Sequence, residues 1–290
     1  NMKACKNKND WIADDAEIFF RKTAKKESGE RSIITIDNFA GDDNVKMKSD
    51  RTKLAEKRCL GEGPDYTGFI LARESGSIGT AVSVYDPIAG RKVELLSQGE
   101  AELFWIIRFR DGVKEIREQM MLAPEIVAEI CTEFGFRRPS HILSTDLLVE
   151  YENGNMTAYS VKSDRSALFQ PNLEPRKQRR ILERQKIEQE YWRRHGAEFK
   201  IVFRTDLNPV YTRNVEAAMA FYDPRFVNSE EDMLKYLVAH KKIRIDMEHG
   251  PVPYARLCRE LPDIKARYRI ALRDGNTGQI RLEGYYAEGN

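Results

Sequence analysis

The sequence predicts an α/β protein whose core is a mixed β-sheet flanked by helices, and three features predict it. Asn153-Gly154-Asn155 is a turn signal between two strand-like runs, which indicates an antiparallel hairpin. A long charged helix follows at 175–195 and leads into another strand at 199–203. Strand, long helix and strand form a crossover, which favours parallel, right-handed pairing. A helix and a strand also precede the hairpin, so antiparallel and parallel pairs would share one sheet.

The helix before the hairpin opens at Ser97 and carries Leu103 and Ile107 on its apolar side. Glu100 lies one turn before them, so we expect its carboxylate to point toward the core rather than into solvent. Ser97 and Glu100 also have the spacing of a capping box, in which the glutamate only satisfies a backbone N–H. Spacing alone favours the cap, and both roles stay open. Val113 to Met121 is predicted to form the next strand.

The hairpin carries the chemistry. We expect three cross-strand pairs that form one apolar face: Leu147 with Val161, Val149 with Tyr159, and Tyr151 with Thr157. Asp146, Ser160 and Lys162 then share the opposite face at the same end of the sheet. A carboxylate beside an ammonium at a sheet end can hold a divalent metal and order an attacking water. The simpler interpretation is a surface Asp–Lys pair worth less than about 1 kcal/mol, and the hairpin alone does not decide.

The crossover helix is predicted to run from Pro175 to His195, with Gly196 placed to end it. Phe199 to Phe203 then forms a strand, and Asn208-Pro209 caps a further helix that runs to about Tyr222. The order is therefore helix, strand, hairpin, helix, strand, helix. This is the core order of the restriction-endonuclease-like fold.

A set of short motifs occurs in a fixed order along this region. They are Gly63, Asp65 and Tyr66, then Leu95-Leu96-Ser97 with Glu100, Ile116-Arg117-Glu118-Gln119, Ser144-Thr145-Asp146, Val161-Lys162, Tyr191-Trp192 and Asn208-Pro209. Together they resemble the TnsA family, the endonuclease subunits of heteromeric transposases in cut-and-paste elements that choose target sites. The resemblance covers about residues 61–222, and the ordered set is far more specific than any single motif.

The resemblance implies a site. The family's metal-binding acids fall on Glu100 and Asp146, and its catalytic lysine falls on Lys162. The family often has glutamine where this sequence has Ser160, so a Ser160 hydroxyl acting through water, or the Val161 carbonyl, would complete an oxygen-rich Mg²⁺ shell. Mn²⁺ is expected to substitute. Asp164 is a weaker substitute ligand, because it lies beyond the expected strand end.

The resemblance also implies the reaction and the partners. TnsA proteins hydrolyse DNA at the 5′ ends of the element, while the transposase TnsB acts at the 3′ ends and TnsC is an ATP-dependent regulator. A stand-alone restriction or repair nuclease would share the same core. The third alternative is a catalytically inert winged-helix binding protein with a decayed nuclease core, which only Ser160 favours.

Three domains are expected: a charged arm at 1–57, a restriction-endonuclease-like catalytic domain at 58–222 and a winged-helix-like domain at 223–290. In the last, a helix from Glu230 to His240 and another starting at Pro253 precede a hairpin around 274–278. Candidate DNA-contacting residues lie early in the long helix and in the last domain: Arg176, Lys177, Arg179, Arg180, Arg267 and Arg269. On the long helix, ion pairs such as Arg179–Glu183 and Arg184–Glu188 explain the charges equally well.

The bulk composition fits such a protein without identifying it. The 290 residues carry 48 basic and 46 acidic side chains, a net charge of +2, which argues against tight autonomous DNA binding and suits action within an assembly. No run is apolar enough to cross a membrane, so we expect a cytoplasmic bacterial protein that joins the nucleoid when active. Four scattered cysteines without C-x-x-C spacing predict reduced thiols rather than zinc.

Overall fold

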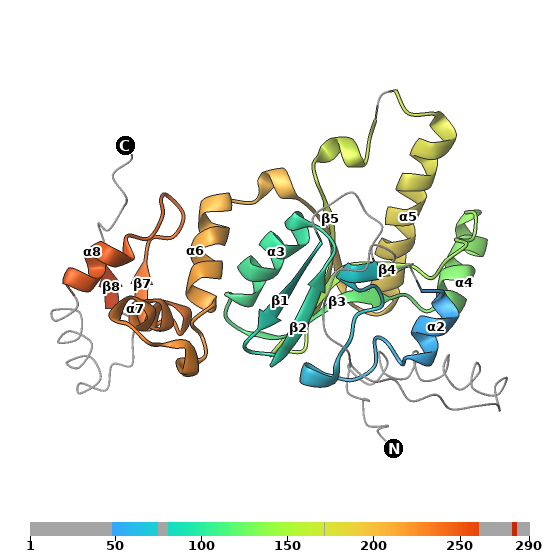
Figure 1. Cartoon of the computed structure of the whole chain (residues 1–290). Helices are drawn as coiled ribbons and strands as arrows, with labels where there is room; N and C mark the ends of the chain where they lie inside the picture. The colour runs from blue at the N-terminus through green and yellow to red at the C-terminus, as the bar shows by residue number, and fades with distance from the viewer. Residues whose placement is uncertain (1–47, 75–80, 171, 261–279, 283–290) are drawn as a thin grey trace, which may run out of the picture. The chain divides into compact units, whose positions relative to one another are not determined.

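The computed structural model describes residues 48–74, 81–170, 172–260 and 280–282 (Figure 1). These residues form two compact units. The first comprises the described residues up to Glu100 together with Gly112–Phe203, and the second comprises Ala101–Asp111 and the described residues from Arg204 onward. The units therefore divide the chain at other positions than the expected domains, whose boundary lay after residue 222.

The first unit is built on a four-stranded mixed sheet. Its strands are β3 (Val113–Met121), β4 (Ser144–Tyr151), β5 (Met156–Lys162) and β6 (Glu198–Phe203), in that spatial order. The pairs β3–β4 and β4–β5 are antiparallel, whereas β5 and β6 are parallel. The mixed sheet, the hairpin and the crossover are thus confirmed.

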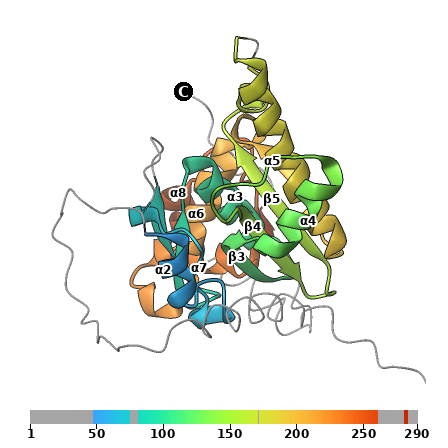
Figure 2. The ribbon, with the colours of Figure 1, turned by 90° about the vertical axis from the view of Figure 1, so that its right-hand side faces the viewer.

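Two helices pack together beside this sheet. The crossover helix α5 (Pro175–Arg194) ends before Gly196, whose φ of +69° is left-handed, as the sequence predicts. α4 (Pro124–Phe134) lies beside it (Figure 2) and was not predicted, although it starts at a proline and ends at Gly135 with φ +66°. Trp192 and Ile130, both fully buried, belong to the core that these helices share with the sheet.

A second hairpin, absent from the sequence analysis, is attached to the sheet by a buried ion pair. Its strands are β1 (Val82–Asp86) and β2 (Arg91–Leu95). The Arg91 guanidinium donates to both oxygens of Glu118 on β3, at 2.8 and 2.7 Å, and to the Ile116 carbonyl at 2.9 Å. Burial raises the pKa of Glu118, and Arg91 opposes that shift. The Arg91–Glu118 pair therefore joins β2 to β3 at a position buried from water.

The expected register of the β4–β5 hairpin was wrong by two residues. Leu147 pairs with Tyr159 and Val149 with Thr157, because the turn is tighter than expected. The Tyr151 N–H donates to the Asn155 carbonyl, and Gly154 has a φ of +78°. Since side chains alternate with a period of two, this shift keeps every residue on its predicted face.

A short helix lies inside the range that was expected to be a charged arm, residues 1–57. α2 (Asp50–Ala55) is capped by Ser49, whose side chain accepts from the Thr52 N–H. Leu54 is buried in the core of the first unit. A serine cap followed by one buried leucine is too short a pattern to separate such a helix from a charged arm.

The second unit contains the end of α3 (Gln98–Arg108), α6 (Pro209–Met219), α7 (Glu230–Ala239) and α8 (Tyr254–Arg259). The caps of α6 and α7 by Asn208 and Ser229 are confirmed. β7 (Ile243–Ile245) pairs in parallel with β8 (Ile280–Leu282). The first strand and turn of the expected hairpin, with Arg267 and Arg269, lie outside the described residues, so the winged helix stays a prediction.

Short 3-10 helices connect several of these elements: Gly63–Asp65, Ala72–Glu74, Arg165–Ala167, Arg204–Asp206 and Pro224–Phe226. Within the described ranges, no helix is both long and apolar enough to cross a membrane. Cys59, Cys131 and Cys258 are free thiols, as expected.

We predict that Arg91→Met lowers the free energy of unfolding by about 3–5 kcal/mol, because it leaves the Glu118 carboxylate buried without its partner. The double variant Arg91→Met/Glu118→Leu should return to within about 2 kcal/mol of the wild type, since no uncompensated charge remains. Urea denaturation of the purified chain measures both.

The control for this pair is Arg179→Ala, which breaks the exposed Arg179–Glu183 bridge of α5. We expect a loss below about 1 kcal/mol there. An Arg91→Met loss as small as this control would show that the buried pair does not anchor the hairpin.

Candidate active site at the end of the central sheet

The structure brings the predicted hairpin residues together at one end of β4 and β5. The Asp146 Oδ2 atom accepts a hydrogen bond of 2.6 Å from the Val161 N–H. The Lys162 ammonium lies 3.9 Å from the same oxygen and donates to the Ser160 hydroxyl at 2.7 Å and the Val161 carbonyl at 3.1 Å. A carboxylate, an ammonium, a hydroxyl and a carbonyl therefore meet, as the shared face predicts.

Glu100 makes one of the two capping-box contacts that its spacing predicts, while its carboxylate accepts from the Leu96 N–H and the Ser97 hydroxyl rather than from the Ser97 N–H. The Ser97 hydroxyl accepts from the Glu100 N–H at 3.2 Å and donates to the Glu100 Oε1 atom at 2.9 Å. The Leu96 N–H donates to Oε2 at 3.0 Å. The side chain is nevertheless almost completely buried, with 5% of the residue exposed. The carboxylate thus stabilises the start of α3 from inside the protein.

Glu100 is also electrostatically coupled to Asp146. Burial raises the pKa of Glu100 to about 7, and repulsion from the Asp146 carboxylate adds to the shift. The hydrogen bonds from Leu96, Ser97 and Gln119 oppose it. The helix start therefore uses this carboxylate while it also lies within electrostatic range of Asp146, and its role as a site acid remains a prediction.

Gln119 links Glu100 to Ser144 of β4 and was missed as a site residue. Its side-chain amide donates to the Glu100 Oε2 atom at 3.1 Å and accepts from the Ser144 hydroxyl at 2.9 Å. It lies between the β3–β4 pairs Glu118–Leu147 and Met120–Thr145, so it is opposite Asp146, with a φ of +47°. A left-handed non-glycine residue inside a strand is strained, and such strain concentrates at functional sites. The only sequence signal was its place in the family motif.

A second buried acid, Glu188 of α5, lies near the half-buried Asp146. It accepts from the Thr145 hydroxyl at 3.4 Å and from the Arg184 Nε atom at 3.3 Å. Burial raises its pKa to about 7; Arg184 and Lys162 lower it, and Asp146 raises it. The predicted Arg184–Glu188 ion pair is confirmed. Its carboxylate is fully buried rather than solvated, as was expected, and i,i+4 spacing does not reveal burial.

The predicted DNA-contacting residues of α5 are exposed on its first turns. Lys177 lies 3.8 Å from Glu174, and Arg179 pairs with Glu183 at 2.7 Å. Asp164 accepts from the Ser166 N–H and so caps a 3-10 turn. It has no described contact with the two acids or the lysine. DNA contact by these residues remains a prediction.

The donor set fits a hard divalent cation. The Ser160 and Val161 oxygens already converge on a positive charge, the Lys162 ammonium, with the Asp146 carboxylate beside it. Within the described part of the chain, no group of three or more His, Cys, Asp or Glu is placed to hold a metal ion. A metal between Glu100 and Asp146 would therefore need carbonyl, hydroxyl, water or phosphate oxygens as well, which Mg²⁺ accepts.

Comparison with known proteins relates the sheet that carries this site to an endonuclease family. Residues 110–204 match the family model of the TnsA-like endonuclease N-terminal domain. The chain is also 28% identical over 169 residues to the Tn7 transposition protein TnsA of Escherichia coli, a match that covers 57% of this chain and 59% of that protein. The family match includes β3, the hairpin, α5 and β6, whereas Glu100 precedes it. Residues 110–204 are therefore similar to a TnsA-like endonuclease N-terminal domain, and the chain spans 59% of the length of the Escherichia coli relative.

We predict that Glu188→Gln stabilises the metal-free protein, and that the gain grows as the pH rises from 4.5 to about 7. In this window the unfolded wild type loses the Glu188 proton while the folded protein keeps it, so wild-type stability falls with rising pH. Glutamine has no proton to lose, and the gain should reach at most about 3 kcal/mol. Urea denaturation at several pH values measures it.

Glu174→Gln, at the exposed start of the same helix, controls for the loss of one carboxylate. A Glu188→Gln gain that does not change with pH would contradict a Glu188 carboxyl held neutral by burial.

Proposed function

We propose that this TnsA-like protein is the metal-dependent endonuclease subunit of a transposase, and that it cuts DNA at the 5′ ends of a mobile element. The observation that carries this proposal is the meeting of Asp146, Lys162 and Glu100 at one end of a sheet whose strands match the TnsA-like endonuclease model. Because the chain spans only 59% of the Escherichia coli relative, its partners and substrate are part of the proposal.

Glu100 and Asp146 would hold Mg²⁺, with the Val161 carbonyl and the Ser160 hydroxyl as neutral oxygen donors. When bound, the ion would polarise the scissile phosphate and lower the pKa of a water. The mutual repulsion of the two carboxylates supports this assignment, since a divalent cation relieves it.

Lys162 has a separate role in this proposal. As an ammonium it cannot accept a proton, so it would orient the attacking water and offset the negative charge that develops on the phosphate. Its contacts with Ser160 and Val161 hold it at the sheet end beside Asp146. Because the Ser160 hydroxyl accepts from Lys162, serine at this position does not favour the alternative of a decayed nuclease core.

The partners follow from the same family. We propose that the chain acts at transposon ends with a TnsB-like transposase and a TnsC-like ATP-dependent regulator, in the bacterial cytoplasm. An experiment distinguishes this proposal from a stand-alone restriction or repair nuclease. Such a nuclease would cut without a transposase and away from element ends.

We predict that Asp146→Asn lowers 5′-strand cutting by more than about 100-fold, because even the outer partners of metal ligands contribute 10- to 100-fold. The assay uses element-end DNA, Mg²⁺ and the transposase partner, with products resolved on a denaturing gel. Asp164→Asn, a change of the same size at the nearby capping residue, should cut normally. Undiminished cutting by Asp146→Asn would refute the site.

A direct test of the metal site is anomalous diffraction from crystals soaked in Mn²⁺. We expect one peak or two within ligand distance of both Glu100 and Asp146, and none in Asp146→Asn crystals. The absence of a peak in wild-type crystals soaked with DNA and partner present would contradict the metal assignment.

A further inference from the structure

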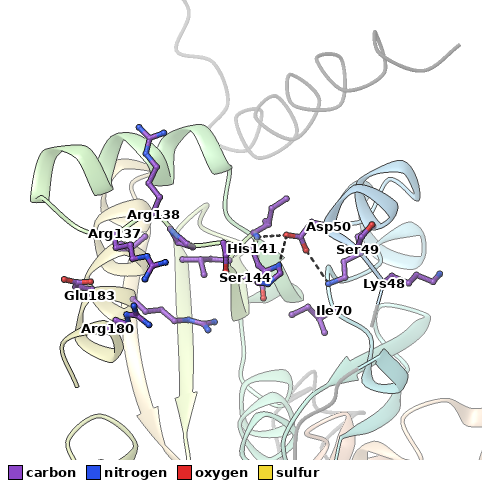
Figure 3. Close-up of a pocket in the computed structure, with 17 residues that line it drawn as sticks. Lys48, Ser49, Asp50, Ile70, Arg137, Arg138, His141, Ser144, Arg180 and Glu183 are labelled. Atoms are coloured by element: carbon purple, nitrogen blue, oxygen red, sulfur yellow. Dashed lines mark hydrogen bonds and ion pairs between the residues drawn. The ribbon is translucent and has the colours of Figure 1, made fainter. Parts of the chain in front are cut away.

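A basic cavity of about 630 Å³ lies in the first unit, between the start of α2, the segment 137–143 and α5 (Figure 3). Its size is typical of sites that bind small molecules or one monomer of a polymer, such as a nucleotide. Its cationic lining residues are Lys48, Lys53, Arg137, Arg138, Arg180 and Arg184. Two acids line it, Asp50 and Glu183, so positive charge predominates.

Both acids of the cavity are already engaged. Asp50 accepts from the Ile142 N–H at 2.8 Å and lies 3.8 Å from both Lys53 and His141. Glu183 is bound by Arg179, which does not line the cavity. These acids therefore have partners other than Arg137 and Arg180.

Arg137 and Arg180 are the cations that remain available. Their side chains make no hydrogen bond or ion pair among the residues for which the structure gives positions. They lie on the α5 side of the cavity, across from Lys48 and Asp50 (Figure 3). Two unpaired guanidinium groups on one wall suit phosphate oxygens, which arginine binds in bidentate fashion.

The lining of the cavity is also strongly apolar: Ile70, Pro139, Ile142, Leu143 and Ile187. A site for free phosphate would need no such surface. A wall of cations beside an apolar surface matches a nucleotide, whose phosphate is charged and whose base and sugar have apolar faces.

The cavity adjoins the candidate active site through two chains of contacts. Ser144 lines it and donates to Gln119, which donates in turn to Glu100. Arg184 also lines it and donates to Glu188, which faces the Asp146 and Lys162 charges. Ser144 and Asp146 are two residues apart on the same face of β4, about 7 Å along the strand.

We propose that this cavity binds an unpaired nucleotide of the DNA strand that is cut, with phosphates on Arg137 and Arg180 and the base or sugar on the apolar lining. In a duplex the bases are stacked inside, so only an unpaired nucleotide can reach such a surface. The inference rests on the proposed function and adds to it a preference for strand ends that are frayed near the cut.

The test is fluorescence anisotropy of the full chain with two DNA probes of equal length and charge. One is fully paired, and the other has three terminal mismatches that leave a fork. We expect the wild type to bind the fork at least about fivefold more tightly. Arg137→Gln/Arg180→Gln should lose this preference. For two lost phosphate contacts, the slope of log K against log [salt] should become shallower by about 1.4.

The matched control is Arg73→Gln/Lys92→Gln, which removes two exposed charges of the same unit that do not line the cavity. It should keep the preference for the fork. Equal binding of both probes by the wild type, an unchanged preference in the Arg137/Arg180 variant, or no DNA binding by the chain would each overturn the proposal. Displacement of the fork by inorganic phosphate at matched phosphate concentration would reduce the cavity to a simple anion site and overturn it too.

Strand cutting, measured in parallel with Mg²⁺ and the transposase, separates the two proposals. Cutting at element ends together with equal binding of fork and duplex would refute the cavity assignment alone. Binding of the fork that depends on Arg137 and Arg180, without any metal-dependent cutting, would refute the endonuclease and leave a strand-end binding protein.

Discussion

The candidate site in the first unit depends on a buried carboxylate, Glu100, that the fold places within electrostatic range of Asp146. Glu100 is buried and faces Asp146, and its raised pKa reflects both effects. Three donors, from Leu96, Ser97 and Gln119, keep the side chain in place against that repulsion. The start of α3 and the strands β3, β4 and β5 carry these groups and their hydrogen-bond partners.

The strands around Glu100 and Asp146 are held by buried polar contacts. The Arg91–Glu118 bridge attaches the β1–β2 hairpin to β3, one residue before the strained Gln119. Gly68 passes so close to this point that a Cβ atom there would lie 2.9 Å from the Glu118 carbonyl. Strain of this kind persists only where the neighbours determine the backbone, and these contacts do so.

Much of the first unit could be predicted because its signals are local. The turn at Asn153–Asn155, the proline and glycine that bound α5, and the alternation that places Asp146 and Lys162 on one face all lie within short windows. The predicted hairpin register was wrong by two residues. A tighter turn leaves every side chain on the same face, so the pattern of apolar and polar residues could not distinguish the two registers. Glu188 and Gln119 could not be found in this way. Their roles depend on burial and on contacts across the fold, which charge spacing along one helix or strand does not contain.

The parallel pairing of β5 with β6 has a consequence for the order in which the site matures. The β4–β5 hairpin joins residues that are near in sequence, so Asp146 and Lys162 can meet early. The partner strand of β5 comes only after all of α5, with Thr157 opposite Glu198, and closing this longer loop is slower. Glu188 arrives with that helix. A chain emerging from the ribosome would therefore bring the acid and the lysine together first, and the site would be complete only after the crossover has formed.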